Sequence, residues 1–396
     1  MIRKTLIAFA VLPLAACGFN GTDRYAEEEE TAQTAPADGA DSMASNDPGA
    51  GESYTAQIPD SEERPIMQAQ VVLDRRGFGP GVIDGKMGKS TENALKGFQE
   101  ANDLEVTGKM DEATKAALEE WNNIPATRVV TIPADWGTLD YAKIPDKPAD
   151  QARMERLGYE SLDEKLAERF HTTIEVLKQL NPGGQPAGAK ETSSPTPTAS
   201  FSPSAAASKA GKTQSTSFFN AGQQIRVPNI GADRIKAGAV DDPNWQQTLA
   251  MLGVGTEQPK VAKVVVDESE GWLKGYNKAG NLVAMFTVTT GSSNDPLPIG
   301  EWGINGVGHN PPFAYQPDLF WDVPDSEEEQ QLPPGPNGPV GVVWIDLTKE
   351  HYGIHGTPEP QTIGRTQSHG CVRLTNWDAA RLAGMVSSST KVVFQS

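Results

Sequence analysis

Two long stretches of this chain contain few of the large apolar side chains from which a folded core is built. Residues 19–63 are rich in Glu, Asp, Ala, Ser, Thr and Gly, and residues 183–220 are rich in Ser, Thr, Pro and Ala. Such segments bury too little surface to offset the entropy lost when a backbone becomes ordered. The 396-residue chain must therefore fold around separate apolar blocks, which indicates two or three domains on flexible connectors.

The balance of charges restricts the partners of the chain. It carries 52 acidic side chains against 34 basic ones, for a net charge of -18. A chain this acidic is repelled by nucleic acid and by anionic lipid head groups. We therefore expect no nucleic-acid partner.

The N-terminus has the features of an export signal. Arg3 and Lys4 precede an apolar run, residues 6–14, that is too short to span a bilayer. The run ends in Leu-Ala-Ala-Cys at residues 14–17, which resembles the lipobox of bacterial lipoproteins. The resemblance implies cleavage before Cys17 and a lipid on its thiol; an ordinary signal with a cysteine by chance is the alternative.

The N-terminal segment also predicts a location. We expect residues 1–17 to be a lipoprotein signal peptide and residues 18–63 a disordered tether. The protein would then be lipid-anchored in the periplasm of a bacterial cell envelope. Gly18, rather than an acidic residue, follows the cysteine and favours the outer membrane.

The number of cysteines bears on the role of Cys371. Cys17 and Cys371 are the two cysteines of the sequence, and in an exported protein two cysteines ordinarily suggest a disulfide. If Cys17 carries a lipid, Cys371 has no partner. An unpaired thiol is a liability in an oxidising compartment, so a catalytic or metal-binding role for Cys371 gains weight.

The first apolar block, residues 64–122, predicts three short helices separated by Gly-rich turns. It resembles the peptidoglycan-binding-like three-helix domain over its whole length. The resemblance implies binding to glycan or stem peptide, with a scaffold as the alternative. The residues that carry it are Gly77, Phe78, Gly81, Ile83, Asp84, Gly85, Gly88, Thr91, Phe98, Gln99, Gly108 and Thr114.

A second block follows an expected connector at residues 123–152. Residues 153–230 show two apolar helical faces and a closing strand near residues 222–228, and they resemble a βααβ LysM module. The resemblance implies glycan binding, with a structural spacer as the alternative. Two features depart from it: no opening strand with a Gly-Asp-Thr turn is recognisable, and the low-complexity insert at residues 183–220 interrupts the unit.

The last block predicts a mostly antiparallel β-domain. After an expected linker with a short helix, residues 231–258, β-branched runs occur at residues 261–266, 283–289 and 340–345. Gly, Asn and Asp turns separate these runs. We therefore expect residues 259–396 to form the β-rich part of a multidomain α+β protein.

Cys371 lies in a short segment that also holds two histidines. A cysteine is a nucleophile as its thiolate, and a nearby imidazole can take up its proton. His369 is close in sequence, but a tight turn at Gly370 would direct it elsewhere, so His355 from a neighbouring strand is the better base. The N–H groups around Gly370 and Cys371 could stabilise a tetrahedral oxyanion.

Two other interpretations of these residues remain open. His355, His369 and Cys371 could ligate zinc, as three-ligand catalytic sites do, although no acidic partner or cysteine pair accompanies them. Alternatively, Cys371 could be a small buried apolar residue. We expect neither a metal nor a cofactor.

The motifs GIHGT at residues 353–357 and SHGCVRL at residues 368–374 are similar to the signature of the L,D-transpeptidase (YkuD-like) catalytic domain. The resemblance covers residues 261–394 and implies a β-rich fold that acts on peptidoglycan stem peptides. Upstream residues in the same order as in that family are Pro298-Ile299-Gly300, Asn310-Pro311-Pro312, Gly335-Pro336-Asn337 and Leu347.

The resemblance also implies residue roles. Cys371 would attack the carbonyl of the third residue of a donor tetrapeptide, usually meso-diaminopimelate, and expel the terminal D-alanine. His355 would be the general base and acid, and the carbonyl of Gly356 would hold its tautomer. Ser368 and His369 would shape the loop.

The sequence does not determine which group accepts the acyl chain from Cys371. A stem amine would give a 3→3 cross-link, water would make the enzyme an L,D-carboxypeptidase, and the same thiol could attach a lipoprotein to peptidoglycan. A wall-binding lipoprotein without catalysis is a further alternative. Arg373 would orient the substrate or brace the site, and the acidic segment 318–339 would be a solvated loop or, less favoured, a lid that recruits a cationic amine.

Overall fold

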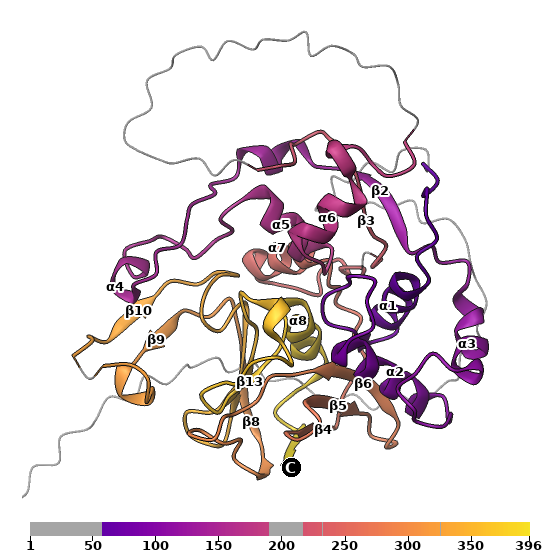
Figure 1. The fold of residues 1–396 in the computed structure, drawn as a ribbon. Coiled ribbons are helices and arrows are strands. Elements are labelled where there is room, and N and C mark those ends of the chain that lie inside the picture. Colours follow the sequence, from indigo (N-terminus) through magenta and orange to yellow (C-terminus); the bar gives the residue numbers. More distant parts are fainter. Residues whose placement is uncertain (1–57, 190–216, 232, 325) are drawn as a thin grey trace, which may run out of the picture. The chain divides into compact units, whose positions relative to one another are not determined.

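The computed structural model describes residues 58–189, 217–231, 233–324 and 326–396 (Figure 1). The expected signal peptide with Cys17, most of the expected tether and most of the insert lie outside these ranges. Within them, no helix is both long and apolar enough to cross a membrane.

The N-terminal helical region contains the three helices that the sequence predicts. They are α1 (Pro65–Arg75), α2 (Lys89–Ala101) and α3 (Glu112–Leu118), followed by a 3-10 turn at Glu119–Trp121. Between α1 and α2 lies a short strand, β1 (Phe78–Gly79). Asp111 caps α3 by accepting a hydrogen bond from the backbone N–H of Thr114.

A βααβ unit follows the helical region. Strands β2 (Thr127–Thr131) and β3 (Gln224–Pro228) pair antiparallel, and α5 (Leu162–Arg169) and α6 (Ile174–Leu180) lie between them in the chain. The unit has its own apolar core, which includes Phe170, Leu177 and Ile225. The expected connector, residues 123–152, therefore contains the opening strand of this unit as well as the short helix α4 (Pro148–Gln151).

The described C-terminal region contains two larger sheets and one two-stranded hairpin. The first has the order β1-β6-β5-β4-β14-β7 and the second β13-β12-β11-β8. Most pairs are antiparallel, as predicted, but β4 with β14, β12 with β13 and β1 with β6 are parallel. The strands are β4 (Lys263–Asp267), β5 (Trp272–Tyr276), β6 (Leu282–Thr287), β7 (Gly300–Trp302), β8 (Ile304–His309), β11 (Val343–Leu347), β12 (Gly353–His355), β13 (Val372–Arg373) and β14 (Lys391–Gln395).

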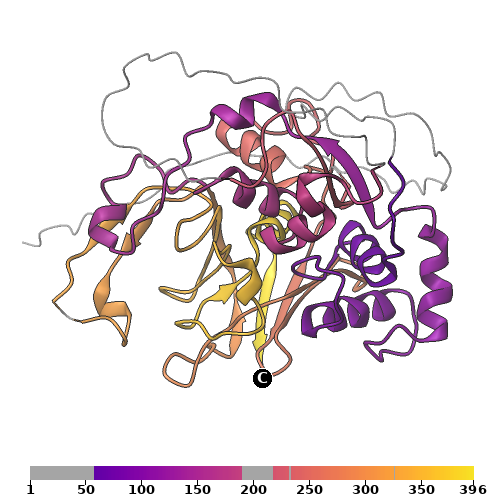
Figure 2. The same cartoon turned by 45° about the horizontal axis from the view of Figure 1, so that its top comes forward.

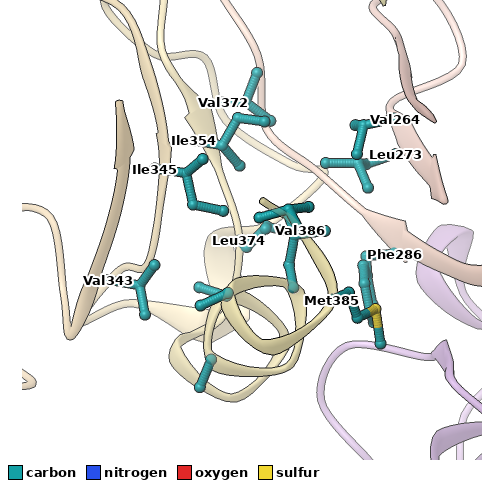
Figure 3. Close-up of a cluster of buried hydrophobic side chains, with 14 of the residues drawn as sticks. Val264, Leu273, Phe286, Val343, Ile345, Ile354, Val372, Leu374, Met385 and Val386 are labelled. Atoms are coloured by element: carbon teal, nitrogen blue, oxygen red, sulfur yellow. The ribbon is translucent and has the colours of Figure 1, made fainter. Parts of the chain in front are cut away.

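The main core of this region joins the two sheets through one helix, α8 (Asn376–Met385). Figure 3 shows Val264, Leu273 and Phe286 of the first sheet and Ile345, Ile354 and Val372 of the second around this helix. A further helix, α7 (Pro243–Leu252), adds Trp245, Leu249 and Leu252 to the same core. Packed apolar side chains of this core thus support one face of β12 and β13, the two strands of the candidate site.

The helical region shares a core with the first sheet. Strand β1 pairs with β6, with Phe78 opposite Met285, and Figures 1 and 2 both show α2 beside this edge of the sheet. Phe98 of α2 and Trp272 of β5 belong to one buried cluster. The expectation of flexible connectors therefore does not describe these two regions, because their apolar faces are buried against each other.

Candidate active site

Cys371 lies one residue before β13, on the strand pair β12–β13. In this parallel pair, Ile354 lies opposite Val372 and His355 lies opposite Arg373. Opposed side chains share a face of a sheet, and so do alternate residues along a strand. His355, Arg373 and Cys371 therefore face the same side of the sheet.

The imidazole of His355 is buried and oriented from two sides. Its Nδ1 lies 2.7 Å from the carbonyl oxygen of Gly356. A carbonyl can only accept a hydrogen bond, so Nδ1 carries the hydrogen and Nε2 remains as a proton acceptor. Trp344, opposite His355 on β11, stacks on the ring with centroids 5.5 Å apart.

The electrostatics of the site keep both reacting groups neutral at rest. Burial and the guanidinium of Arg373 lower the pKa of His355 to about 4. Burial raises the pKa of the Cys371 thiol, although the N–H of Gly353 and the charge of Arg373 act in the opposite direction. At neutral pH the pair is thus a thiol and a neutral imidazole, so any reaction of the sulfur as a nucleophile would require its proton to move.

The backbone around Cys371 is held by its neighbours. The Ser368 hydroxyl donates to the carbonyl of Cys371 at 2.6 Å, and the Ser368 N–H donates to the carbonyl of Thr290 at 2.9 Å. Gly370 has a φ of +94°, and a Cβ at this position would lie 2.7 Å from a ring carbon of Tyr352. Only glycine fits there, because a side chain would clash with the ring of Tyr352 and the positive φ disfavours other residues.

His369 points to the acidic segment. Its Nε2 lies 2.8 Å from Asp322 Oδ1, and its ring packs edge-on against Phe320 with centroids 5.1 Å apart. The segment belongs to the hairpin of β9 (Phe313–Tyr315) and β10 (Gln330–Leu332), which includes a 3-10 turn at Pro317–Leu319. The sequence favoured a solvated loop for residues 318–339, whereas this part of the segment contacts the loop that carries Cys371.

Sequence reasoning missed four residues that surround the site. Trp344 and Tyr352 contact His355 and Gly370, and Asp322 contacts His369. Asn376 accepts from the N–H of Val342 at 3.2 Å, and a Cβ on Gly356 would lie 2.2 Å from its Oδ1. Each contact crosses between strands or segments, so no local pattern could reveal it.

The three residues considered as zinc ligands make separate contacts. His355 Nδ1 bonds to a backbone carbonyl and His369 Nε2 bonds to Asp322. Within the described ranges, no group of three or more His, Cys, Asp or Glu side chains is arranged to hold a metal ion.

Two family models match the chain. Residues 262–394 match the L,D-transpeptidase catalytic domain, and residues 63–118 match a putative peptidoglycan binding domain. The resemblances of these two regions to the catalytic domain and to the peptidoglycan-binding-like domain are thereby confirmed.

Curated relatives match parts of the chain. The putative L,D-transpeptidase YkuD of Bacillus licheniformis is 49% identical over 59 residues, which is 15% of this chain and 36% of that protein. The probable L,D-transpeptidase YbiS of Escherichia coli K12 is 28% identical over 195 residues, which is 46% of this chain and 61% of that protein. The chain thus spans less than two thirds of the length of either relative.

Solved structures match about a third of the chain. An L,D-transpeptidase from Mycobacterium smegmatis is 20% identical with a TM-score of 0.28, over 34% of this chain and 58% of that one. The catalytic domain of the E. faecium L,D-transpeptidase acylated by ertapenem is 18% identical with a TM-score of 0.27, over 34% of this chain and 97% of that one.

Proposed function

We propose that this chain, whose residues 262–394 match the L,D-transpeptidase catalytic domain, is a peptidoglycan L,D-transpeptidase that forms 3→3 cross-links between stem peptides. One observation carries the proposal. A buried, neutral imidazole with Nδ1 bound to the Gly356 carbonyl shares a sheet face with a free thiol. A cysteine acyltransferase needs a thiol and an imidazole that can take up its proton, and a shared face of the sheet supports this pairing.

The first half-reaction follows from this arrangement. Cys371 Sγ bonds to the carbonyl carbon of the third stem residue while its proton passes to His355 Nε2. The N–H groups around Gly370 and Cys371 stabilise the oxyanion of the tetrahedral intermediate. As the intermediate collapses, the C–N bond to the terminal D-alanine breaks, and the imidazolium returns its proton to the leaving amine.

The second half-reaction reverses these roles. The side-chain amine of an acceptor stem attacks the thioester, and His355 takes its proton and returns it to the departing sulfur. Gly356 and Trp344 keep the imidazole in one orientation through both steps. Arg373 influences both reacting groups and so favours the thiolate while it disfavours a lasting imidazolium.

The remaining regions fit a role at the cell wall. We propose that the helical region and the βααβ unit, a LysM-like module, bring Cys371 to peptidoglycan. We also propose that a lipid on Cys17 anchors the protein in the periplasm, at the outer membrane. The match of residues 63–118 to a putative peptidoglycan binding domain supports the first part.

Mass spectrometry of reaction products tests the proposal. Full-length protein is incubated with purified disaccharide-tetrapeptide, alongside Cys371→Ala and His355→Gln. A cross-linked dimer that is absent from both variants supports transpeptidation. Tripeptide without dimer overturns it in favour of an L,D-carboxypeptidase, and unchanged substrate in all samples overturns both activities.

A further inference from the structure

A second, polar groove lies beside the Cys371 site. It has a volume of about 530 Å³ and is lined by residues 268–271 and 288–293, by Gly364, Thr366 and Gln367, and by Pro296. Lys89, the first residue of α2, completes it from the helical region. Two parts of the chain that the family models match separately therefore form one groove.

One wall of the groove leads directly to the loop that carries Cys371. The Thr290 carbonyl accepts from the N–H of Ser368 at 2.9 Å, and Thr289 exchanges backbone hydrogen bonds with Arg373 at 2.8 and 3.1 Å. The Thr289 hydroxyl also accepts from the N–H of Gly364 at 2.9 Å. A chain that reacts at Cys371 and extends past Ser368 would enter this groove.

Contacts between α2 and the sheet hold the groove in shape. The amide of Asn93 donates to the Gly271 carbonyl and to the Thr287 hydroxyl, each at 3.3 Å. Lys96 lies 3.6 Å from Glu270, on the loop that forms the groove floor. Since α2 also shares the apolar core of the sheet, its first residue, Lys89, is held at the groove by the position of the helix.

The lining specifies the chemistry of the ligand. Serine, threonine and glycine residues line the groove, together with three charged residues, Lys89, Glu268 and Glu270. Among the residues that line it, none is aromatic, so no flat apolar surface is present on which a sugar ring could pack. The surface suits an extended peptide that carries both signs of charge.

We propose that this groove binds the donor stem peptide beyond its reacting residue, with Lys89 pairing with a carboxylate and Glu268 with an ammonium group. The proposal rests on the proposed function, since it names the part of the same substrate that the groove takes. It gives the helical region a direct part in substrate recognition. That part is separate from any general affinity for the cell wall.

Charge reversal at Lys89 tests the proposal, with Lys86→Glu as the matched control three residues earlier and outside the groove. With disaccharide-tetrapeptide, Lys89→Glu should raise KM about fivefold, the scale of one partly exposed ion pair, and leave kcat nearly unchanged. Lys86→Glu should change neither value. Equal KM values in Lys89→Glu and wild type, or equal increases in both variants, overturn the proposal.

Two further measurements separate the possible failures. Binding of free tetrapeptide to full-length Cys371→Ala, with and without Lys89→Glu, reports on the groove without turnover, and loss of affinity with Lys89→Glu is expected. An effect seen with the disaccharide form alone would assign the groove to glycan and overturn the peptide assignment. Acylation of Cys371 by a carbapenem, which lacks a stem peptide, reports on the reactivity of the thiol alone. If the wild-type protein is not acylated, the proposed function is overturned. The binding measurement then decides whether the groove takes the peptide.

Discussion

The helical region and the βααβ unit both pack against the catalytic region, but through different chemistry. The helical region shares an apolar cluster with the first sheet, including Phe98 and Met285. The βααβ unit closes its own core and meets the catalytic region largely through polar groups, such as Glu168 with Asn376 at 2.6 Å and Glu164 with Asn337 at 2.7 Å. Apolar contact is non-directional, whereas buried polar contact depends on each partner.

A buried charged cluster shows how far the polar contacts depend on each partner. Asp74 of α1 lies 3.0 Å from Arg381 of α8 and 3.2 Å from His171 of the βααβ unit. Burial alone would raise the pKa of Asp74, but Arg381 and His171 hold it at about 2. The ring of His171 stacks on Trp377 with centroids 4.7 Å apart, so three regions meet at one ion pair.

The largest expected effect on stability is at the apolar interface between the helical region and the first sheet. Phe98 is fully buried, and Phe98→Ala should lower the free energy of unfolding by about 4 kcal/mol, because it leaves a cavity in the shared core. Phe98→Leu, which keeps most of the volume, should cost about 1.5 kcal/mol or less. Urea unfolding measures both, and equal losses would show that this interface is not governed by packed volume.

The next effect is on the charged cluster. Arg381→Met should lower the free energy of unfolding by about 3 kcal/mol, because Asp74 then remains buried without its ion-pair partner. The double variant Asp74→Asn, Arg381→Met should recover much of this loss, since it also removes the carboxylate that Arg381→Met leaves without its ion-pair partner. Arg153→Met, at an exposed ion pair, is the control. A double variant no more stable than Arg381→Met would contradict the explanation.

A smaller effect is expected where the βααβ unit meets the active site. Glu168 accepts from the amide of Asn376, and it also accepts a hydrogen bond from Tyr159. Glu168→Ala should lower the free energy of unfolding by about 2 kcal/mol, because it leaves buried donors unsatisfied. Glu168→Gln keeps an acceptor and should cost less. Thermal unfolding compares the two, and the ranking fails if Gln costs as much as Ala.

The smallest expected effect is a dependence on pH. Burial raises the pKa of Glu168 to about 7, so the folded state keeps its proton where the unfolded state has lost it. The free energy of unfolding should therefore fall as the pH rises from about 5 to 7, by about 1 kcal/mol or more. Urea unfolding at several pH values should show a shallower fall in Glu168→Gln, and an identical fall would exclude Glu168 as the source.

Local sequence signals predicted much of the secondary structure. Helical spacing and Gly-rich turns predicted α1, α2 and α3, and the three β-branched runs predicted β4, β6 and β11 of the catalytic region. The opening strand β2 was recognised as extended but assigned to a connector, because its partner β3 lies far along the chain, beyond the insert. Strand β1 is too short to carry any periodic signal.

The features of the candidate site likewise fall into those that the sequence predicted and those that only the structure shows. The spacing of His355 and Cys371 and the flexibility of glycine at position 370 were visible in the sequence. The contact of His369 with Asp322 and that of Asn376 with Glu168 were not, because each joins segments with no shared local pattern.

The sequence by itself determined which groups are available for a reaction: the thiol of Cys371, the imidazoles of His355 and His369, and the glycines next to them. Tertiary structure decided how they act. The register of β12 against β13 placed His355 and Cys371 on one face, and burial favours the neutral form of both, by lowering the pKa of His355 and raising that of Cys371. Register and burial come from long-range packing, which sets the surroundings of a side chain independently of its neighbours in sequence.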